Sequence, residues 1–169
     1  MKYVALLRGI NVGGTGTLPM KELATLCEGF GWASVRTYIQ SGNVVFESSA
    51  GEAKIQEQLE RALEVRMGKK VWVMVRTCEE LRSVLEGNPF GDREPAKVAV
   101  VFLDDAMQAD WKKGVIAPDG EQVEAGRREL YVYYPLGMGR TKLKLPLNGA
   151  ATTARNINTV GRLVALAEG

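Results

Sequence analysis

The chain of 169 residues contains no histidine and only two cysteines. The lack of histidine excludes Ser-His-Asp and Cys-His catalytic machinery, as well as every zinc site that needs a histidine. Cys27 and Cys78 are too few for a four-cysteine zinc site or for a disulfide framework. Cys27 falls on an apolar helical stripe, which predicts a small core residue. The sequence therefore assigns no catalytic residue, metal or cofactor, and we expect a reducing, cytoplasmic setting.

The chain also lacks a strong net charge and any long apolar run. Its 22 Lys and Arg residues against 20 Asp and Glu residues give a net charge of +2. A charge this small does not by itself indicate nucleic acid or an anionic membrane as a partner. No apolar stretch approaches membrane-spanning length, and the N-terminal residues do not have the pattern of a secretory signal. The hydrophobic fraction of 46% is typical of a globular protein of one domain or two small ones.

Hydrophobic periodicity predicts an α+β fold. In the first half, strands are predicted at residues 3–7, 35–40, 44–46 and 71–75, with helices at residues 19–30 and 52–63. This order of strand, helix, strand, strand, helix, strand is the split βαβ, or ferredoxin-like, plan with an antiparallel sheet. A capping-box spacing from Thr77 to Glu80 predicts a trailing helix that ends at Gly87.

The second half repeats part of this order. It shows a strand at 98–103, a short helix containing Met107 and Trp111, and strands near 121–125 and 130–134. A last helix is predicted to start near Thr153 or Asn156 as N-cap. We therefore predict two ferredoxin-like subdomains, residues 1–86 and 87–169, the second carrying the C-terminal helix. The pattern of residues 135–150 is compatible with a loop and with a short basic helix.

A glycine-rich loop after the first strand is the best candidate for a site. Arg8 ends an apolar strand, and Asn11, Gly13 and Gly14 follow it before a helix begins near Pro19. Glycines allow backbone N–H groups to approach a ligand, and a helix N-terminus behind such a loop favours an anion. The spacing matches neither of the common glycine-rich phosphate motifs, so a plain connector is the alternative.

Two later stretches resemble companions of this loop. Gln40-Ser41-Gly42-Asn43 joins two predicted strands and is more than a turn only if its polar side chains face the first loop. Thr153-Ala154-Arg155-Asn156 lies at the predicted start of the last helix, where a bound anion would offset the unfavourable position of an arginine. The candidate ligand-binding residues are Arg8, Asn11, Gly13, Gly14, Gln40, Ser41, Asn43, Arg140, Lys142, Arg155 and Asn156.

These motifs resemble a bacterial family catalogued as domain of unknown function 1697. The resemblance is carried by residues 5–14, 37–46, 88–90 and 153–159, and it extends over nearly the whole chain. Thr141 stands where the family usually has serine, and Ile157 stands where tryptophan is common. The resemblance implies two ferredoxin-like subdomains, in agreement with the duplication, and it brings no established activity, cofactor or catalytic residue.

Three functions compete at this point. The first is binding of a small anionic or phosphorylated ligand, in which arginine would make bidentate contacts to the anion. The second is nucleic-acid binding by sheet aromatics and basic residues, with candidates Tyr131, Tyr133, Tyr134, Arg127, Arg128 and Arg140. The third is an interaction module in which the motif residues only brace turns and caps. The fold alone decides none of these, and the oligomeric state stays open.

Overall fold

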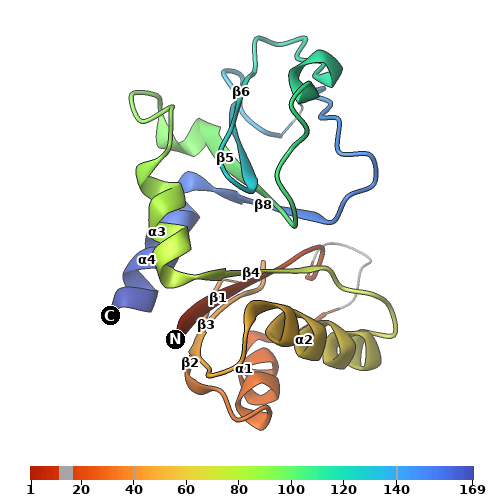
Figure 1. Cartoon of the computed structure of the whole chain (residues 1–169), viewed down its shortest axis with the longest axis vertical. Helices are drawn as coiled ribbons and strands as arrows, with labels where there is room; N and C mark the ends of the chain where they lie inside the picture. The colour runs from red at the N-terminus through yellow and green to blue at the C-terminus, as the bar shows by residue number, and fades with distance from the viewer. Residues whose placement is uncertain (12–16, 40, 140) are drawn as a thin grey trace. The chain divides into compact units, whose positions relative to one another are not determined.

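The computed structural model describes residues 1–11, 17–39, 41–139 and 141–169, which form two compact units (Figure 1). The first unit comprises Met1–Arg82 and Arg162–Gly169, and the second comprises Ser83–Gly161. The predicted boundary lies after residue 86, whereas the contacts within each unit place it after Arg82. The final eight residues were predicted to belong to the second unit, but they group with the first.

The first unit is built on a four-stranded antiparallel sheet. Its strands are β1 (Lys2–Leu7), β2 (Ala33–Tyr38), β3 (Asn43–Glu47) and β4 (Val73–Thr77), in the order β2-β3-β1-β4. Helices α1 (Met20–Gly29) and α2 (Glu52–Met67) connect them in the predicted split βαβ order. Strand β1 lies between β3 and β4, and residues 3–7 are all buried, as the uncharged run predicts.

Helices α1 and α2 cover the same face of this sheet (Figure 1). Their apolar stripes bury Leu23 and Cys27 from α1 and Leu59 from α2 against the strands. Trp32 stacks on Phe46 with ring centroids 4.1 Å apart, which adds aromatic packing to the same core. Burial raises the pKa of the Cys27 thiol to about 12, so the predicted role of this residue in the core is confirmed.

The second unit contains a sheet of the same topology. Its strands are β5 (Val98–Leu103), β6 (Gln122–Ala125), β7 (Glu129–Tyr133) and β8 (Thr152–Asn156), in the antiparallel order β6-β7-β5-β8. Helix α3 (Cys78–Glu86) precedes this sheet, a short 3₁₀-helix (Pro95–Lys97) leads into β5, and α4 (Ile157–Glu168) follows β8. Both sheets therefore have the strand order that the ferredoxin-like prediction requires.

The two crossovers of the second sheet differ from those of the first. The predicted helix around Met107 and Trp111 is a 3₁₀-helix of only four residues, Trp111–Gly114, and Met107 lies outside it. The described part of residues 135–150 contains no helix, and an isolated bridge joins Lys144 to Ile116. Apolar side chains of these irregular segments pack on the sheet in place of α-helices; they are Met107, Trp111, Val115, Leu143, Leu145 and Leu147.

Strand β8 is the main correction to the predicted elements. We expected Thr153 or Asn156 to begin the last helix, but Thr153 lies within β8 and α4 begins at Ile157. Thr152 pairs with Leu103 and Arg155 pairs with Val100 in the β5–β8 ladder. The side-chain oxygen of Asn156 accepts the Asn158 N–H at 2.8 Å, so Asn156 does cap α4, as the second of the two options predicts.

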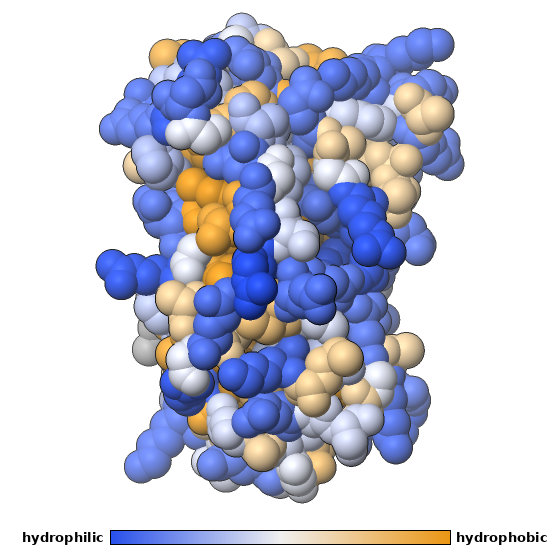
Figure 2. All heavy atoms as spheres, turned by 60° about the vertical axis from the view of Figure 1, so that its left-hand side comes forward, coloured by the Kyte–Doolittle hydropathy of each residue, from blue (hydrophilic) through white to orange (hydrophobic). Residues whose placement is uncertain are grey.

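The surface is consistent with the ordinary composition of the chain. Hydrophilic side chains cover most of the face shown in Figure 2, and apolar residues appear between them in patches. Within the described part of the chain, no helix has both the length and the hydropathy that a membrane crossing requires.

Candidate functional site

Three chain segments meet at one end of the first sheet. Because β1 is antiparallel to both β3 and β4, its last residue lies beside the first residues of its two neighbours. The Leu7 N–H donates to the Gly42 carbonyl at 2.9 Å, and the Arg8 N–H donates to the Trp72 carbonyl at 2.9 Å. The Arg8 motif and the Ser41-Gly42-Asn43 turn, which the sequence separates by some thirty positions, are therefore neighbours. We call Arg8, Asn11, Ser41, Asn43, Lys70 and Trp72 the Arg8 cluster.

Gly42 allows this close approach. Its φ of +89° lies in the region that residues with a Cβ rarely adopt. A Cβ at this position would lie 2.5 Å from Ile10 Cδ1 and 3.0 Å from Leu7 Cβ. The turn thus packs directly on the segment around Arg8, and no larger residue fits between them.

Asn11 braces the two ends of the glycine-rich loop. Its side-chain oxygen accepts the Leu18 N–H at 2.7 Å, and its Nδ2 donates to the Leu18 carbonyl at 2.9 Å. Its φ of +56° is one that asparagine tolerates better than most residues. Gly13 and Gly14 fall between these braced ends, but they are outside the described residues. The amide of Asn11 therefore ties the segment before the glycine-rich loop to the segment after it.

Asn43 braces the β2–β3 hairpin in a similar way. Its side chain is fully buried, and its Nδ2 donates to the Tyr38 carbonyl at 2.8 Å and to Ser41 Oγ at 3.1 Å. A buried amide needs such partners, because leaving it without them costs about 1–3 kcal/mol. Gln40, another candidate, is outside the described residues. Ser41 and Asn43 thus shape the turn that lies against the Arg8 segment.

The exposed cations of the cluster are Arg8 and Lys70. Lys70 Nζ lies 4.2 Å from the ring centroid of Trp72, whose side chain is 36% exposed. Lys70 also lines a shallow pocket that carries carboxylates of α2, among them Glu60 and Glu64. These carboxylates offset part of the charge of Lys70.

Lys70 and Trp72 were absent from the candidates named in the sequence analysis. A signal for them exists, since Lys69-Lys70 stands directly before the predicted strand at 71–75. In the split βαβ plan that strand pairs with β1 in the antiparallel sense, so its first residues must lie beside Arg8.

Arg155 and Asn156 belong to the second unit, and both have structural roles there. The Arg155 side chain is buried, and its Nη1 donates to Thr153 Oγ1 at 2.8 Å and to the Ala154 carbonyl at 2.9 Å. Burial lowers the pKa of Arg155 to about 10, which leaves it charged at neutral pH. Asn156 Nδ2 donates to the carbonyls of Pro95 and Ala96, each at 3.2 Å, in addition to its capping bond.

Lys142 is exposed in the irregular segment before β8, and Arg140 is outside the described residues. Next to Lys142, the Thr141 hydroxyl donates to the Glu121 carboxylate at 2.7 Å and accepts the Leu143 N–H at 3.1 Å. Glu121 also accepts the Asp119 N–H at 2.9 Å. Burial raises the pKa of Glu121, but the hydrogen bonds from Thr141 and the backbone outweigh it, so the pKa is lowered overall.

This lowered pKa predicts how acid affects the second unit. A carboxyl group whose folded pKa is depressed stabilises the fold above its ordinary value of 4.5, and this contribution is lost as the pH falls through the folded pKa. The wild type should therefore lose more stability on acidification than Thr141→Val, which removes the donated bond while keeping the shape of the side chain. Thermal unfolding of both proteins across the acidic range measures this, and parallel curves would show that the bond does not influence the titration.

The tyrosines considered for base stacking pack against other residues of the second unit. Tyr131 is buried and donates its hydroxyl to the Val84 carbonyl at 2.6 Å. Tyr133 is half-buried against Phe90, and Tyr134 packs against the core cluster of the sheet. These rings do not form an exposed platform, which removes the main support for nucleic-acid binding by sheet aromatics.

Comparison with known proteins agrees with this architecture. A family described as "Protein of unknown function (DUF1697)" matches residues 1–131, and no curated protein matches the chain. Among solved structures, the chain is similar to conserved bacterial protein SP0830 from Streptococcus pneumoniae. The TM-score is 0.78 at 25% sequence identity, covering 98% of this chain and 97% of that one. Because the family match extends over well more than half of the sequence, the chain belongs to the DUF1697 family.

Proposed function

We propose that the protein binds a small anionic, phosphate-bearing ligand at the Arg8 cluster. The observation that carries the proposal is the packing of the Gly42 turn on the Leu7–Ile10 segment, which joins two polar motifs at one sheet end. Arg8 is exposed at this junction. An exposed guanidinium can form two parallel hydrogen bonds to phosphate oxygens, and such charge-assisted bonds are stronger than neutral ones.

The residues of the cluster divide into contact and positioning roles in this proposal. Arg8 contacts the anion and supplies most of the binding free energy. Asn11 and Asn43 act through the backbone, because their side-chain amides hold the loop ends and the hairpin in place. Lys70 adds a smaller attraction, since carboxylates of α2 share its surroundings.

The first test is a thermal-shift screen of phosphate, pyrophosphate, nucleotides and sugar phosphates at low ionic strength. A ligand that binds only the folded state stabilises it by mass action, by about 2.7 kcal/mol at a hundred times its dissociation constant. Short RNA belongs in the same screen, because a salt-sensitive shift with RNA alone would favour nucleic acid over a small anion.

The second test is calorimetric titration of pyrophosphate into variants of the cluster. Arg8→Ala should weaken binding roughly tenfold or more, because a hydrogen bond to a charged group contributes about 1.5–3 kcal/mol. Lys70→Ala should weaken it only about two- to fivefold, as expected for an exposed charge.

Lys2→Ala is the matched control, because it removes one charge from the opposite end of the same strand, about 20 Å away at the usual rise of a strand. Equal weakening by Lys2→Ala and Arg8→Ala would mean that pyrophosphate responds only to net charge. If no compound binds and Arg8→Ala chiefly lowers stability, the motif has only a structural role. The interaction-module alternative is then favoured.

A further inference from the structure

Trp72, the aromatic residue of the Arg8 cluster, lies directly opposite Arg8 across two strands. The β1–β4 ladder ends with Leu7 opposite Val73, and the Arg8 N–H donates to the Trp72 carbonyl at 2.9 Å. The same register therefore places Arg8 opposite Trp72. Opposed residues of an antiparallel pair leave the same face of the sheet, with Cβ atoms about 5 Å apart. A guanidinium group and an indole ring thus start side by side at this end of the sheet.

The Trp72 ring is supported by a lysine and is partly open to solvent. Lys70 Nζ lies 4.2 Å from the ring centroid, where the ammonium group is attracted to the face of the ring. Trp72 is nevertheless 36% exposed. An exposed tryptophan offers a large, rigid surface that another ring can cover.

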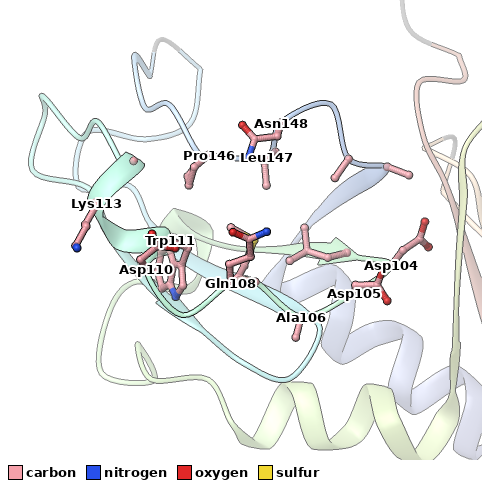
Figure 3. Close-up of a pocket in the computed structure, with 15 residues that line it drawn as sticks. Asp104, Asp105, Ala106, Gln108, Asp110, Trp111, Lys113, Pro146, Leu147 and Asn148 are labelled. Atoms are coloured by element: carbon pink, nitrogen blue, oxygen red, sulfur yellow. The ribbon is translucent and has the colours of Figure 1, made fainter.

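The other two tryptophans do not offer a comparable surface. Trp32 is buried in the core of the first sheet. Trp111 is half-buried against the core of the second sheet, and it lines a cavity together with Asp105 and Asp110 (Figure 3). Carboxylates near a ring disfavour a ligand that carries a phosphate. Among the described residues, Trp72 is the one aromatic residue that is exposed, and it lies beside the arginine that the anion site requires.

An exposed aliphatic side chain lies on the other side of the Arg8 segment. Ile39 is 47% exposed, and its carbonyl accepts the Gly42 N–H at 3.3 Å in the turn that packs on Leu7 and Ile10. Its φ of +50° is uncommon for a β-branched residue, and residues held in such regions cluster at ligand sites. Apolar surface therefore flanks Arg8 on the β3 side and on the β4 side, which favours a ligand that carries more than a phosphate.

We infer that the anion bound at the Arg8 cluster is a mononucleotide, whose phosphate contacts Arg8 and whose base stacks on the Trp72 indole. The inference rests on the proposed anion site and adds the part of the ligand beyond the phosphate. A sugar phosphate would leave the Trp72 ring uncovered, because it has no planar aromatic group. A nucleic-acid strand would need rings for successive bases, whereas the described residues present a single exposed one.

The test is calorimetric titration of AMP and of ribose 5-phosphate into the whole protein at low ionic strength. The two ligands share the sugar and the phosphate, and only AMP carries a base. AMP should bind about tenfold more tightly, as expected for one base stacked on an aromatic ring. In an NMR titration, AMP should also shift the Trp72 indole N–H signal much further than ribose 5-phosphate does.

Variants locate the base. The readout is the ratio of the two affinities, because a change in stability or in the phosphate contact affects both ligands. Trp72→Leu should lower this ratio from about ten to about one, whereas Trp72→Phe should keep most of it because an aromatic ring remains. Trp111→Leu, the matched control in the second unit, should leave the ratio unchanged. Arg8→Ala should weaken both ligands by a similar factor.

The outcomes separate this inference from the anion site on which it rests. If wild type binds AMP and ribose 5-phosphate equally and Arg8→Ala weakens both, the anion site stands and the mononucleotide inference is wrong. If the preference for AMP survives in Trp72→Leu, the base does not stack on Trp72 and the inference is also wrong. Tighter binding of a short RNA than of AMP would overturn it in favour of nucleic acid. If neither phosphate compound binds, the anion site and the inference fail together.

Discussion

Replacing Gly42 by alanine is expected to lower the free energy of unfolding by about 2–5 kcal/mol. About 1–2 kcal/mol of this comes from holding a residue with a Cβ at a φ of +89°. A further 1–3 kcal/mol or so comes from the methyl group, which would overlap Ile10 and crowd Leu7. Chemical denaturation of the wild type and the variant measures the sum.

Gly68→Ala separates these two contributions. Gly68 caps α2 with a φ of +73°, and a Cβ there would meet nothing within 4 Å. It should therefore show only the conformational cost of about 1–2 kcal/mol. If Gly42→Ala lowers the free energy of unfolding no more than Gly68→Ala does, the Gly42 turn does not pack on the Arg8 segment. The conclusion that the two motifs are in contact would then be wrong.

Asn43→Asp is expected to destabilise the protein by about 3–5 kcal/mol at neutral pH, although the two side chains have nearly the same shape. The position is fully buried, and the introduced oxygen would face the Tyr38 carbonyl, which now accepts a hydrogen bond at 2.8 Å. An uncompensated charge in such a place costs about this much. Denaturant unfolding of both proteins gives the difference.

The cost of this substitution should depend on pH with a defined sign. Burial and the facing carbonyl raise the folded-state pKa of the introduced carboxyl, so the group is neutral and less unfavourable at acidic pH. The destabilisation should shrink as the pH falls toward the ordinary value for aspartate, about 3.9, and grow as the pH rises. Asn158→Asp is the control, because Asn158 is exposed in the first turn of α4 and should change stability little at any pH. A cost that does not vary with pH would show that Asn43 is not buried as described.

The order of elements in the first unit was predictable because its strands and helices carry clean hydrophobic periodicity. The run at residues 3–7 has no charge and lies in the sheet interior, and the stripe of α1 contains Cys27, which is buried. When strands and helices alternate in the split βαβ order, the pairing of the end of β1 with β3 and β4 follows. The sequence was therefore sufficient to predict that Arg8 lies next to the Gly42 turn.

Strand β8 was not predictable by the same reasoning. Its sequence Thr-Thr-Ala-Arg-Asn has four polar residues in five, and Thr152, Thr153 and Arg155 are nevertheless buried. A strand of this kind lacks apolar alternation, and its polar residues match the signals that cap a helix instead. Only the β5 ladder, which is a long-range contact, distinguishes the two readings.

The roles of the residues in the candidate site also could not be predicted from the sequence. Asparagine in a glycine-rich loop is equally compatible with contacting a ligand and with bracing a turn. The partners of Asn11 and Asn43 are backbone groups, Leu18 and Tyr38, that no spacing rule identifies in advance. Trp72 could have been found by extending the strand pairing one residue before β4, because the Arg8 N–H donates to the Trp72 carbonyl. Lys70 then follows, because its ammonium lies over the Trp72 ring.

The central claim is that the Arg8 cluster binds an anion, and an amide NMR titration of the wild type with pyrophosphate tests it most directly. The claim predicts saturable shifts that gather at Arg8, at Ser41 and Gly42, and at the backbone and indole N–H groups of Trp72. It also predicts that Arg8→Ala needs roughly tenfold more pyrophosphate, or more, to reach the same shifts, while the rest of the spectrum is retained. Shifts spread over surface lysines without saturation, or no shifts at all, would contradict it.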